Sequence, residues 1–171
     1  MNQPINLVAI QLVSTPDIDD NFAQVIEQLE RAKRDIDTNL PSLVVLPECF
    51  AFFGGRDISA LSLLDGQVQA QLFDRLASIA KSYQIWLIAG SIPTPSPVPD
   101  KMYATALCFD PHGQLVGKYH KTHLFDVDIN DATGAYRESQ STLAGTEPFV
   151  LETDFGRIGV CICYDLRFTT L

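Results

Sequence analysis

The sequence predicts an α/β fold, and two kinds of segment indicate it. Three runs of strand length are almost wholly apolar, at residues 5–13, 42–46 and 85–91. At 22–36 and 68–83, apolar residues instead recur every three or four positions, which is the spacing of a helix with one buried face. Apolar strands that alternate with such helices are typical of a sheet covered by helices.

The first half of the chain reads as strand, helix, strand, helix, strand. INLVAIQLV (5–13) is rich in β-branched residues, and the polar TPDIDD after it offers several helix N-caps. SLVVL (42–46) has no polar face, so we expect a strand that is covered on both sides. The loop CFAFFGGRD (49–57) separates it from the second helix. The apolar positions of the two helices are Phe22, Val25, Ile26, Leu29, Ala32 and Ile36, and Val68, Leu72, Leu76, Ile79 and Ala80.

The second half predicts hairpins rather than helices. PTPSPVP (93–99) can be neither helix nor interior strand, so we expect a surface loop there. MYATALCFD and QLVGKYH flank the turn PHG and predict a β-hairpin. Residues 120–146 are polar and irregular, with Gly134 and Gly145. FVLET and RIGVCIC then predict a second strand pair across the turn DFG.

Composition and charge exclude several classes of protein. The 171 residues are 46% hydrophobic and carry a formal net charge of -9. One core and a single domain, 1–171, fit that length, and the acidic balance argues against a protein that binds nucleic acid. No apolar run reaches the ~18 residues of a membrane span and no signal peptide is visible at the start, so we expect a cytoplasmic protein. All four cysteines are expected to be free thiols.

Four polar residues are poorly explained as ordinary surface charges or core residues: Glu48 in VVLPECF, Lys121 in YHKTHLFD, Glu138 in YRES and Cys163 in CICYDLRF. Three of them follow the end of a predicted strand, the usual position of active sites in α/β sheets. A thiol where a helix begins gains from the amide dipoles, and a nearby ammonium lowers its pKa further. A carboxylate can take its proton, and a lysine can stabilise an oxyanion. Together they predict acyl transfer in one pocket shielded from water.

Some of these residues, and others near them, also have purely structural or alternative explanations. Singly, Glu48 and Lys121 are explained as solvated charges, and Cys161 as small core filler. His120-x-x-His123 with Cys161-x-Cys163 offers zinc ligands, but the spacings are too short for a structural zinc site, so no metal is predicted. GQLVGK resembles a phosphate loop, yet it is one residue short and lacks Ser or Thr after the lysine. His112 is a turn residue.

The flanking words resemble those of the nitrilase, or carbon-nitrogen hydrolase, superfamily. LPECF, K-x-HLFD, Y-x-ES and ICYDLRF occur here in the order of that family. The resemblance implies that Glu48 is the general base, Lys121 the oxyanion-stabilising lysine and Cys163 the nucleophile. It implies that Glu138 positions substrate and lysine, and that the backbone N–H of Tyr164 is a second oxyanion donor. It also implies a four-layer α-β-β-α sandwich.

KTHLFDVDI and the RES block are most similar to the branch of ω-amidases and deaminated-glutathione amidases. That resemblance implies a small amide as substrate, a thioester intermediate, no metal or organic cofactor, and a homodimer. The chain departs from the family at RFTTL, where Thr169 and Thr170 replace the expected Pro and Glu. We therefore expect a hydrolase that lacks its C-terminal part, with exposed apolar faces. The alternative is an inactive fragment that acts only as a partner of full-length relatives.

Overall fold

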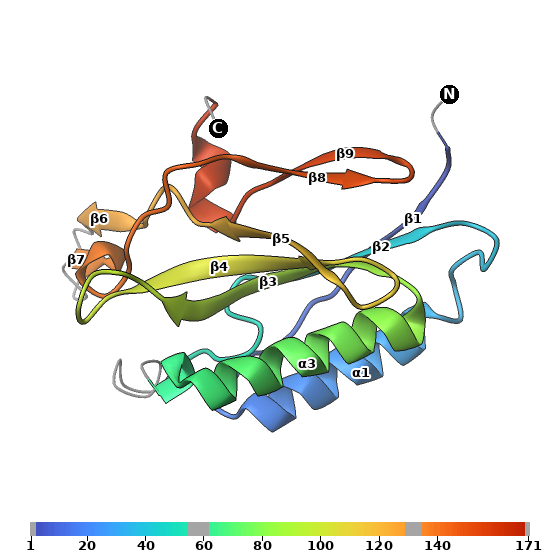
Figure 1. The fold of residues 1–171 in the computed structure, drawn as a ribbon, viewed down its shortest axis with the longest axis horizontal. Helices are drawn as coiled ribbons and strands as arrows, with labels where there is room; N and C mark the ends of the chain where they lie inside the picture. Colours follow the sequence, from blue (N-terminus) through green and yellow to red (C-terminus); the bar gives the residue numbers. More distant parts are fainter. Residues whose placement is uncertain (1–2, 55–61, 129–134, 170–171) are drawn as a thin grey trace.

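A five-stranded mixed sheet forms the centre of the computed structural model, which describes residues 3–54, 62–128 and 135–169 (Figure 1). The strand order is β1-β2-β3-β4-β5, parallel from β1 to β3 and antiparallel from β3 to β5. The strands are β1 (Asn6–Ala9), β2 (Ser42–Leu46), β3 (Trp86–Pro95), β4 (Met102–Phe109) and β5 (Leu115–His120). The hairpin predicted around PHG is β4 and β5.

Two helices cover one face of this sheet, α1 (Ile18–Ala32) and α3 (Gly66–Tyr83). Each begins at an aspartate, Asp17 or Asp65, whose carboxylate accepts hydrogen bonds from the first free backbone N–H groups. A short 3-10 helix, Ser62–Leu64, precedes α3. Both helices lie where the apolar spacing predicts them.

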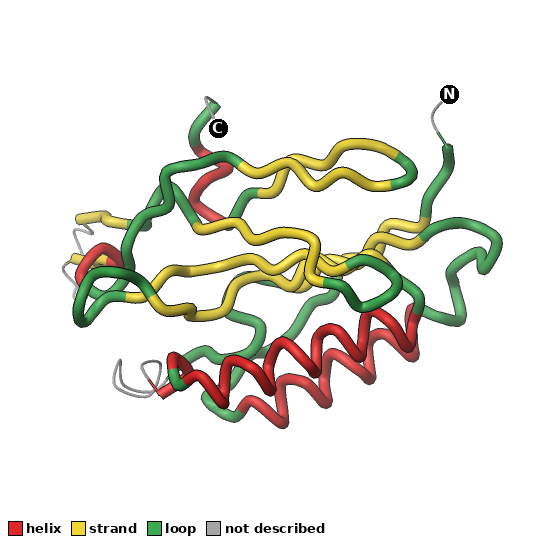
Figure 2. Tube along the Cα trace, viewed as in Figure 1, coloured by secondary structure: helices red, strands yellow, loops and turns green. Residues whose placement is uncertain are grey.

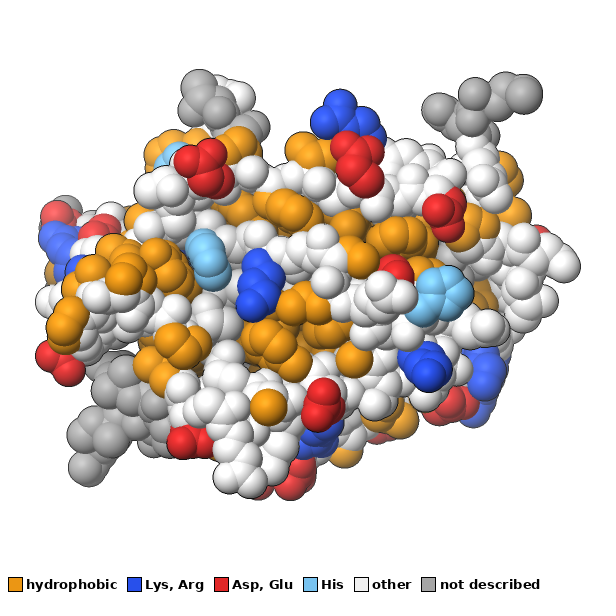
Figure 3. Space-filling model, viewed as in Figure 1, with side chains coloured by type: hydrophobic (Ala, Val, Ile, Leu, Met, Phe, Trp, Pro, Cys, Tyr) orange, Lys and Arg blue, Asp and Glu red, His pale blue; other side chains and the backbone are white. Residues whose placement is uncertain are grey.

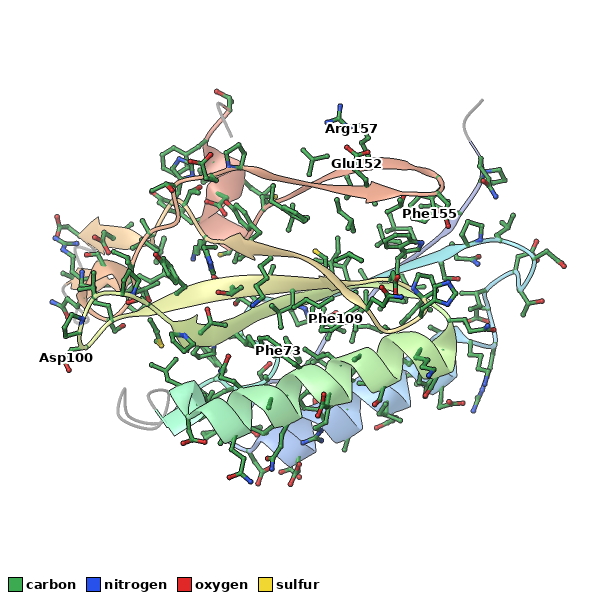
Figure 4. The ribbon with its side chains drawn as sticks, in the orientation of Figure 1. Phe73, Asp100, Phe109, Glu152, Phe155 and Arg157 are labelled. Carbon is green, nitrogen blue, oxygen red and sulfur yellow. The ribbon has the colours of Figure 1, made fainter. Side chains whose placement is uncertain are left out.

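The main core lies between the helices and the sheet. It contains Phe22 and Val25 of α1 and Leu76 of α3, all nearly inaccessible to solvent. Figure 4 shows Phe73 of α3 and Phe109 of β4 in this layer. The buried face of α3 is the one that the sequence predicts. In α1, Phe22, Val25 and Leu29 are buried as predicted, but Ile26 is exposed and Ile36 lies beyond the end of the helix. The α/β class is confirmed.

A separate hairpin lies over the opposite face of the sheet, as the tube in Figure 2 shows. It consists of β8 (Phe149–Thr153) and β9 (Gly156–Val160), with Phe149 opposite Val160 in the register. Leu151, Val160 and Ile162 pack on Trp86, Ile88 and Tyr119 to form a second core. The predicted pairing of FVLET with the following strand is confirmed.

The segment between β5 and β8 is more regular than expected. It contains a two-stranded pair, β6 (Asp126–Asp128) with β7 (Ala135–Arg137), and a 3-10 turn at Glu138–Gln140. A further 3-10 helix, Cys163–Arg167, follows β9 where the sequence suggests a longer helix. Part of the loop 49–57, together with Gly134 and Thr170, lies outside the described residues.

The expected surface loop at 93–99 is partly wrong, because β3 continues to Pro95. Beyond Ala89, β3 pairs with β4 but no longer with β2. A proline has no N–H to donate, and it is tolerated in a strand where one side needs no partner. The prolines therefore lie at the part of β3 that has lost its β2 neighbour.

Apolar side chains also remain on the surface. Figure 3 shows hydrophobic side chains gathered over the middle of the face turned to the viewer. Leu115 and Val116 of β5 and Val150 of β8 are among the exposed residues, and Leu166 is 76% exposed. Exposed apolar faces are thus present, as expected. No described helix is both long and apolar enough for a membrane span.

Candidate active site

Lys121 is the centre of the candidate site. It directly follows β5, and its backbone is held on both sides: its N–H donates to Ala104 O at 2.9 Å, and its carbonyl accepts from Gly145 N at 2.8 Å. A β-carbon at Gly145 would lie 2.2 Å from the carbonyl oxygen of His120, so only glycine fits this approach. The lysine side chain is 2% exposed, and an ammonium buried to this degree requires charged partners.

The first partner is Glu48, in the turn after β2. Its Oε1 accepts from Lys121 Nζ at 2.7 Å. The turn is tightly fixed, since Cys49 N donates to Ser91 Oγ at 2.9 Å and Cys49 has a left-handed φ of 55°. Gly90 lies so close that a β-carbon there would meet Pro47 O at 1.8 Å. Packing of β2 against β3 therefore sets the position of this carboxylate.

The second partner is Glu138, in the 3-10 turn after β7. Both of its oxygens accept from Lys121 Nζ, at 3.1 and 2.9 Å. Glu138 Oε2 also accepts from Phe125 N at 2.7 Å, which fixes the carboxylate from a second direction. Two carboxylates thus share one ammonium.

These contacts raise the pKa of Lys121. Burial is the largest single influence and would lower it, but hydrogen bonds to Glu48 and Glu138 and the charges of both carboxylates together raise it above its ordinary value. The lysine is therefore a permanent cation at neutral pH. It can polarise a carbonyl oxygen, and it does not serve as a base.

Cys163 begins the 3-10 turn after β9 and has a left-handed φ of 48°. Burial raises the pKa of its thiol, and the hydrogen bond to Glu48 and the charge of Glu48 raise it further, while Lys121 lowers it. The net direction is upward, so the expected lowering is wrong. The reason is that burial of the thiol, together with the carboxylates of Glu48 and Glu138, outweighs the one ammonium of Lys121. Glu48, Lys121 and Glu138 are thus the charged groups that act on the thiol.

The thiol is more open to solvent than expected, since Cys163 is exposed in the described part of the chain. The prediction of a pocket shielded from water is therefore confirmed for Lys121 and wrong for the sulfur of Cys163. A hollow beside Cys163 is lined by Phe125, Tyr164, Leu166 and Arg167. A separate cavity of about 360 Å³ reaches Glu48 and Glu138. Its remaining lining is mainly apolar and aromatic: Cys49, Phe52, Phe53, Gly54, Ile92, Pro93, Met102, Tyr103, Ala104 and Tyr136, with Ser91, Ser141 and Thr142.

Tyr164 follows the thiol in the same turn. Its ring packs edge-on against Phe125 at 5.0 Å and Phe168 at 5.4 Å between centroids. Among the described residues, no acceptor bonds to its backbone N–H, whereas the next N–H, that of Asp165, donates to Ile162 O. The Tyr164 N–H is thus available to a ligand.

Sequence reasoning missed Asp165. This aspartate is 1% exposed and accepts hydrogen bonds from Ile162 N at 2.9 Å, Tyr119 Oη at 2.7 Å and His123 N at 2.8 Å. It stands in the quoted word ICYDLRF, two positions after the thiol, but its partners Tyr119 and His123 are distant in sequence.

The alternative interpretations fare differently. Cys161 is exposed, so core filler is wrong: Val160 and Ile162 point into the second core, and strand alternation turns Cys161 outward. His120 Nδ1 bonds to Thr105, and His123 Nδ1 bonds to Asp165. Within the described ranges, no group of three or more His, Cys, Asp or Glu is placed to hold a metal. All four cysteines are free thiols.

Fold and site together define an α/β protein with a cysteine beside a buried lysine that two glutamates share. Residues 6–171 match the carbon-nitrogen hydrolase family, and the chain belongs to that family. A deaminated glutathione amidase of Yersinia enterocolitica is 36% identical over 170 residues, which is 97% of this chain and 56% of that protein. An omega-amidase of Saccharomyces cerevisiae, NIT3, is 34% identical over 175 residues, 100% of this chain and 59% of that protein.

Solved structures with a similar fold belong to the same superfamily. The NitFhit protein of C. elegans superposes with a TM-score of 0.79 at 30% identity, over 95% of this chain and 38% of that one. Nit3 of Saccharomyces cerevisiae, a member of branch 10 of the nitrilase superfamily, gives 0.78 at 30% identity, over 97% and 58%. The fold is thus that of the nitrilase superfamily, whose four-layer sandwich was expected. The chain spans little more than half the length of the two curated relatives.

Proposed function

We propose that this chain carries the active site of an amidase, a hydrolase of non-peptide carbon-nitrogen bonds in small carboxylic acid amides. The observation that carries the proposal is the position of Lys121 Nζ, 2.7 Å from Glu48 and 2.9 Å from Glu138, with the Cys163 thiol beside Glu48. A nucleophile, a base and an oxyanion donor are the groups that acyl transfer requires.

In the first step, Cys163 Sγ attacks the amide carbon while Glu48 takes the thiol proton. The raised pKa of the thiol supports this order, because a protonated thiol needs a base at the moment of attack. Lys121 and the free N–H of Tyr164 stabilise the negative oxygen of the tetrahedral intermediate. The carbon-nitrogen bond then breaks, Glu48 returns the proton to the leaving nitrogen, and a thioester remains on Cys163.

In the second step, Glu48 takes a proton from water, and the resulting hydroxide attacks the thioester carbon. The carbon-sulfur bond breaks, the proton returns to the thiolate, and the carboxylic acid leaves. Glu138 holds the lysine through two hydrogen bonds and so keeps Nζ in place after Glu48 becomes protonated. These steps need no metal or organic cofactor.

The names of the relatives support an ω-amidase or deaminated-glutathione amidase type of substrate. The deaminated glutathione amidase and the omega-amidase described above both match nearly all of this chain. We propose the same substrate class here, with the acyl portion in the cavity beside Glu48 and Glu138. The homodimer, the cytoplasmic location and the single domain stay predictions.

Intact-mass measurement after incubation with a small amide tests the function. We expect an acyl adduct that is lost in Cys163→Ala and kept in Cys161→Ala, a matched control because both thiols are exposed and two residues apart. An adduct that persists in Cys163→Ala would overturn the assignment. No adduct and no product with any small amide, from a folded chain, would favour the inactive fragment.

A further inference from the structure

Asp165 is a buried carboxylate that gathers hydrogen bonds from two segments of the candidate site. From the end of β5 and the segment after it, it accepts from Tyr119 Oη at 2.7 Å, His123 N at 2.8 Å and Thr122 Oγ1 at 3.1 Å. His123 Nδ1 lies 2.9 Å from the same Oδ1 that accepts from His123 N. From the segment after β9, Asp165 accepts from Ile162 N at 2.9 Å. A single carboxylate thus joins two parts of the chain.

Each of these segments carries a residue of the proposed mechanism. Lys121 lies between Tyr119 and His123, and Cys163 directly follows Ile162. The Asp165 carboxylate accepts from Ile162 N while Asp165 N donates to Ile162 O at 3.1 Å, so two bonds close a loop around Cys163 and Tyr164. This closure accompanies the left-handed φ of 48° at Cys163, a conformation that a residue with a side chain seldom adopts.

We propose that Asp165 is a positioning residue that fixes the Cys163 thiol against Glu48 and Lys121. This proposal rests on the function proposed above. In that reaction Asp165 itself touches no reacting atom. The proposal explains why an acidic side chain is buried at a position where the proposed reaction needs neither an acid nor a base. It also explains how a turn of only five residues holds an exposed thiol in one place.

The charge of Asp165 supports this role. Burial acts to raise its pKa, but hydrogen bonds from Ile162, Tyr119 and His123 lower it overall, so the side chain is an anion with acceptor sites for every donor around it. An asparagine of the same size has one acceptor oxygen and two donor hydrogens, so it faces N–H donors with an N–H of its own. Asp165→Asn therefore releases the turn without creating a cavity.

The pH dependence of Cys163 alkylation by iodoacetamide tests the proposal without any amide substrate. The experiment uses a Cys161→Ser background, because Cys161 is the other exposed thiol. Burial raises the pKa of Cys49 to about 11 and that of Cys108 to about 12, so both react slowly. The charged groups that act on Cys163 are Glu48, Lys121 and Glu138.

Asp165→Asn is expected to move the alkylation midpoint of Cys163 to lower pH, because a released thiol leaves Glu48 and gains solvent. A fall of about one pH unit gives about tenfold faster alkylation near neutral pH. The matched control is Asp110→Asn. Asp110 also accepts from two backbone N–H groups, His112 at 2.9 Å and Gln114 at 2.8 Å, but in the β4–β5 turn away from the site. Its midpoint is expected to equal that of the background.

An unchanged midpoint in folded Asp165→Asn, or an equal shift in Asp110→Asn, overturns the proposal. If Asp165→Asn does not fold, Tyr119→Phe removes one partner of Asp165 and leaves the backbone bonds intact. A smaller shift in the same direction is then expected, and no shift overturns the proposal.

Amide hydrolysis gives a second readout. Misplacement of the nucleophile predicts a kcat about 100-fold lower in Asp165→Asn with KM changed less than about threefold. If the parent chain hydrolyses no amide, the proposed function fails, yet the alkylation midpoint still decides the role of Asp165.

Discussion

Replacing Lys121 with methionine is expected to destabilise the fold by setting two carboxylates against each other. Methionine keeps most of the length and apolar volume of the lysine stem, so the main change is loss of the ammonium. Glu48 and Glu138 both lie within 3 Å of Nζ, so their nearest oxygens lie within about 6 Å of each other. In the variant, nothing neutralises this pair.

The magnitude follows from that distance. Two unit charges about 5 Å apart repel by about 3 kcal/mol at an effective dielectric of about 20. Removal of one partner from a buried ion pair typically costs about 3–5 kcal/mol. Because Glu48 is 29% exposed and Glu138 14%, solvent screens part of the repulsion, and we expect about 3 kcal/mol less free energy of unfolding near neutral pH.

The pH dependence has a definite sign. In Lys121→Met, the two carboxylates repel each other only while both carry a charge. The loss of stability is therefore greatest at neutral and alkaline pH and shrinks as acid neutralises one of them. In the parent chain, Lys121 has a raised pKa, so its contribution is complete below its ordinary pKa and is lost only at strongly alkaline pH.

Urea unfolding at about pH 7.5 and about pH 5 measures both effects. The matched control is Lys121→Met with Glu138→Gln, which removes one of the two opposed charges. We expect the double variant to be more stable than the single one near neutral pH, with a smaller difference at the lower pH. Equal stability of the two variants at neutral pH would refute the reasoning, because it would mean that the carboxylates do not repel.

Three further changes test other parts of the structure. Gly90→Ala places a β-carbon 1.8 Å from Pro47 O at a φ of 30°, and thermal unfolding should show a loss of about 3 kcal/mol; a loss below about 0.5 kcal/mol contradicts this. Glu48→Gln removes an acceptor and a charge that raise the pKa of Cys163, so the alkylation midpoint of that thiol should fall; a rise is inconsistent with the site. Asp17→Ala removes the acceptor of Asp19 N and Asp20 N, and urea unfolding should show a loss of about 1 kcal/mol, whereas no loss denies the cap a role.

The fold could be predicted where its cause is local. SLVVL gives the bounds of β2 as the structure has them, and the spacing of Leu72, Leu76 and Ile79 places the buried face of α3. The extension of β3 to Pro95 could not be predicted in this way. It depends on which neighbour each part of the strand retains, and that follows from the pairing of β2, β3 and β4.

The site divides in the same way. Glu48, Lys121 and Glu138 occur in recognisable words, and their meeting was predicted from those words. Asp165 lies in the word ICYDLRF, but its role could not be predicted from it, because its partners His123 and Tyr119 are 42 and 46 positions away. The direction of the pKa shift of Cys163 could not be predicted from the sequence either, since it depends on the burial of the sulfur and on how many charges of each sign lie near it.

That balance of charge bears on how the proposed reaction begins. Burial and two carboxylates raise the pKa of Cys163 more than one ammonium lowers it, so the resting sulfur is a thiol, and an ion pair of thiolate and lysine is disfavoured. The proton must therefore leave during attack on the amide, and Glu48 is the carboxylate that acts most strongly on the thiol. A protonated thiol is also a weak nucleophile toward a reagent whose attack is not assisted by a base that removes the thiol proton. The same charges that make Cys163 slow toward simple alkylating agents thus favour its reaction with a substrate that places a carbonyl between Glu48, Lys121 and the sulfur.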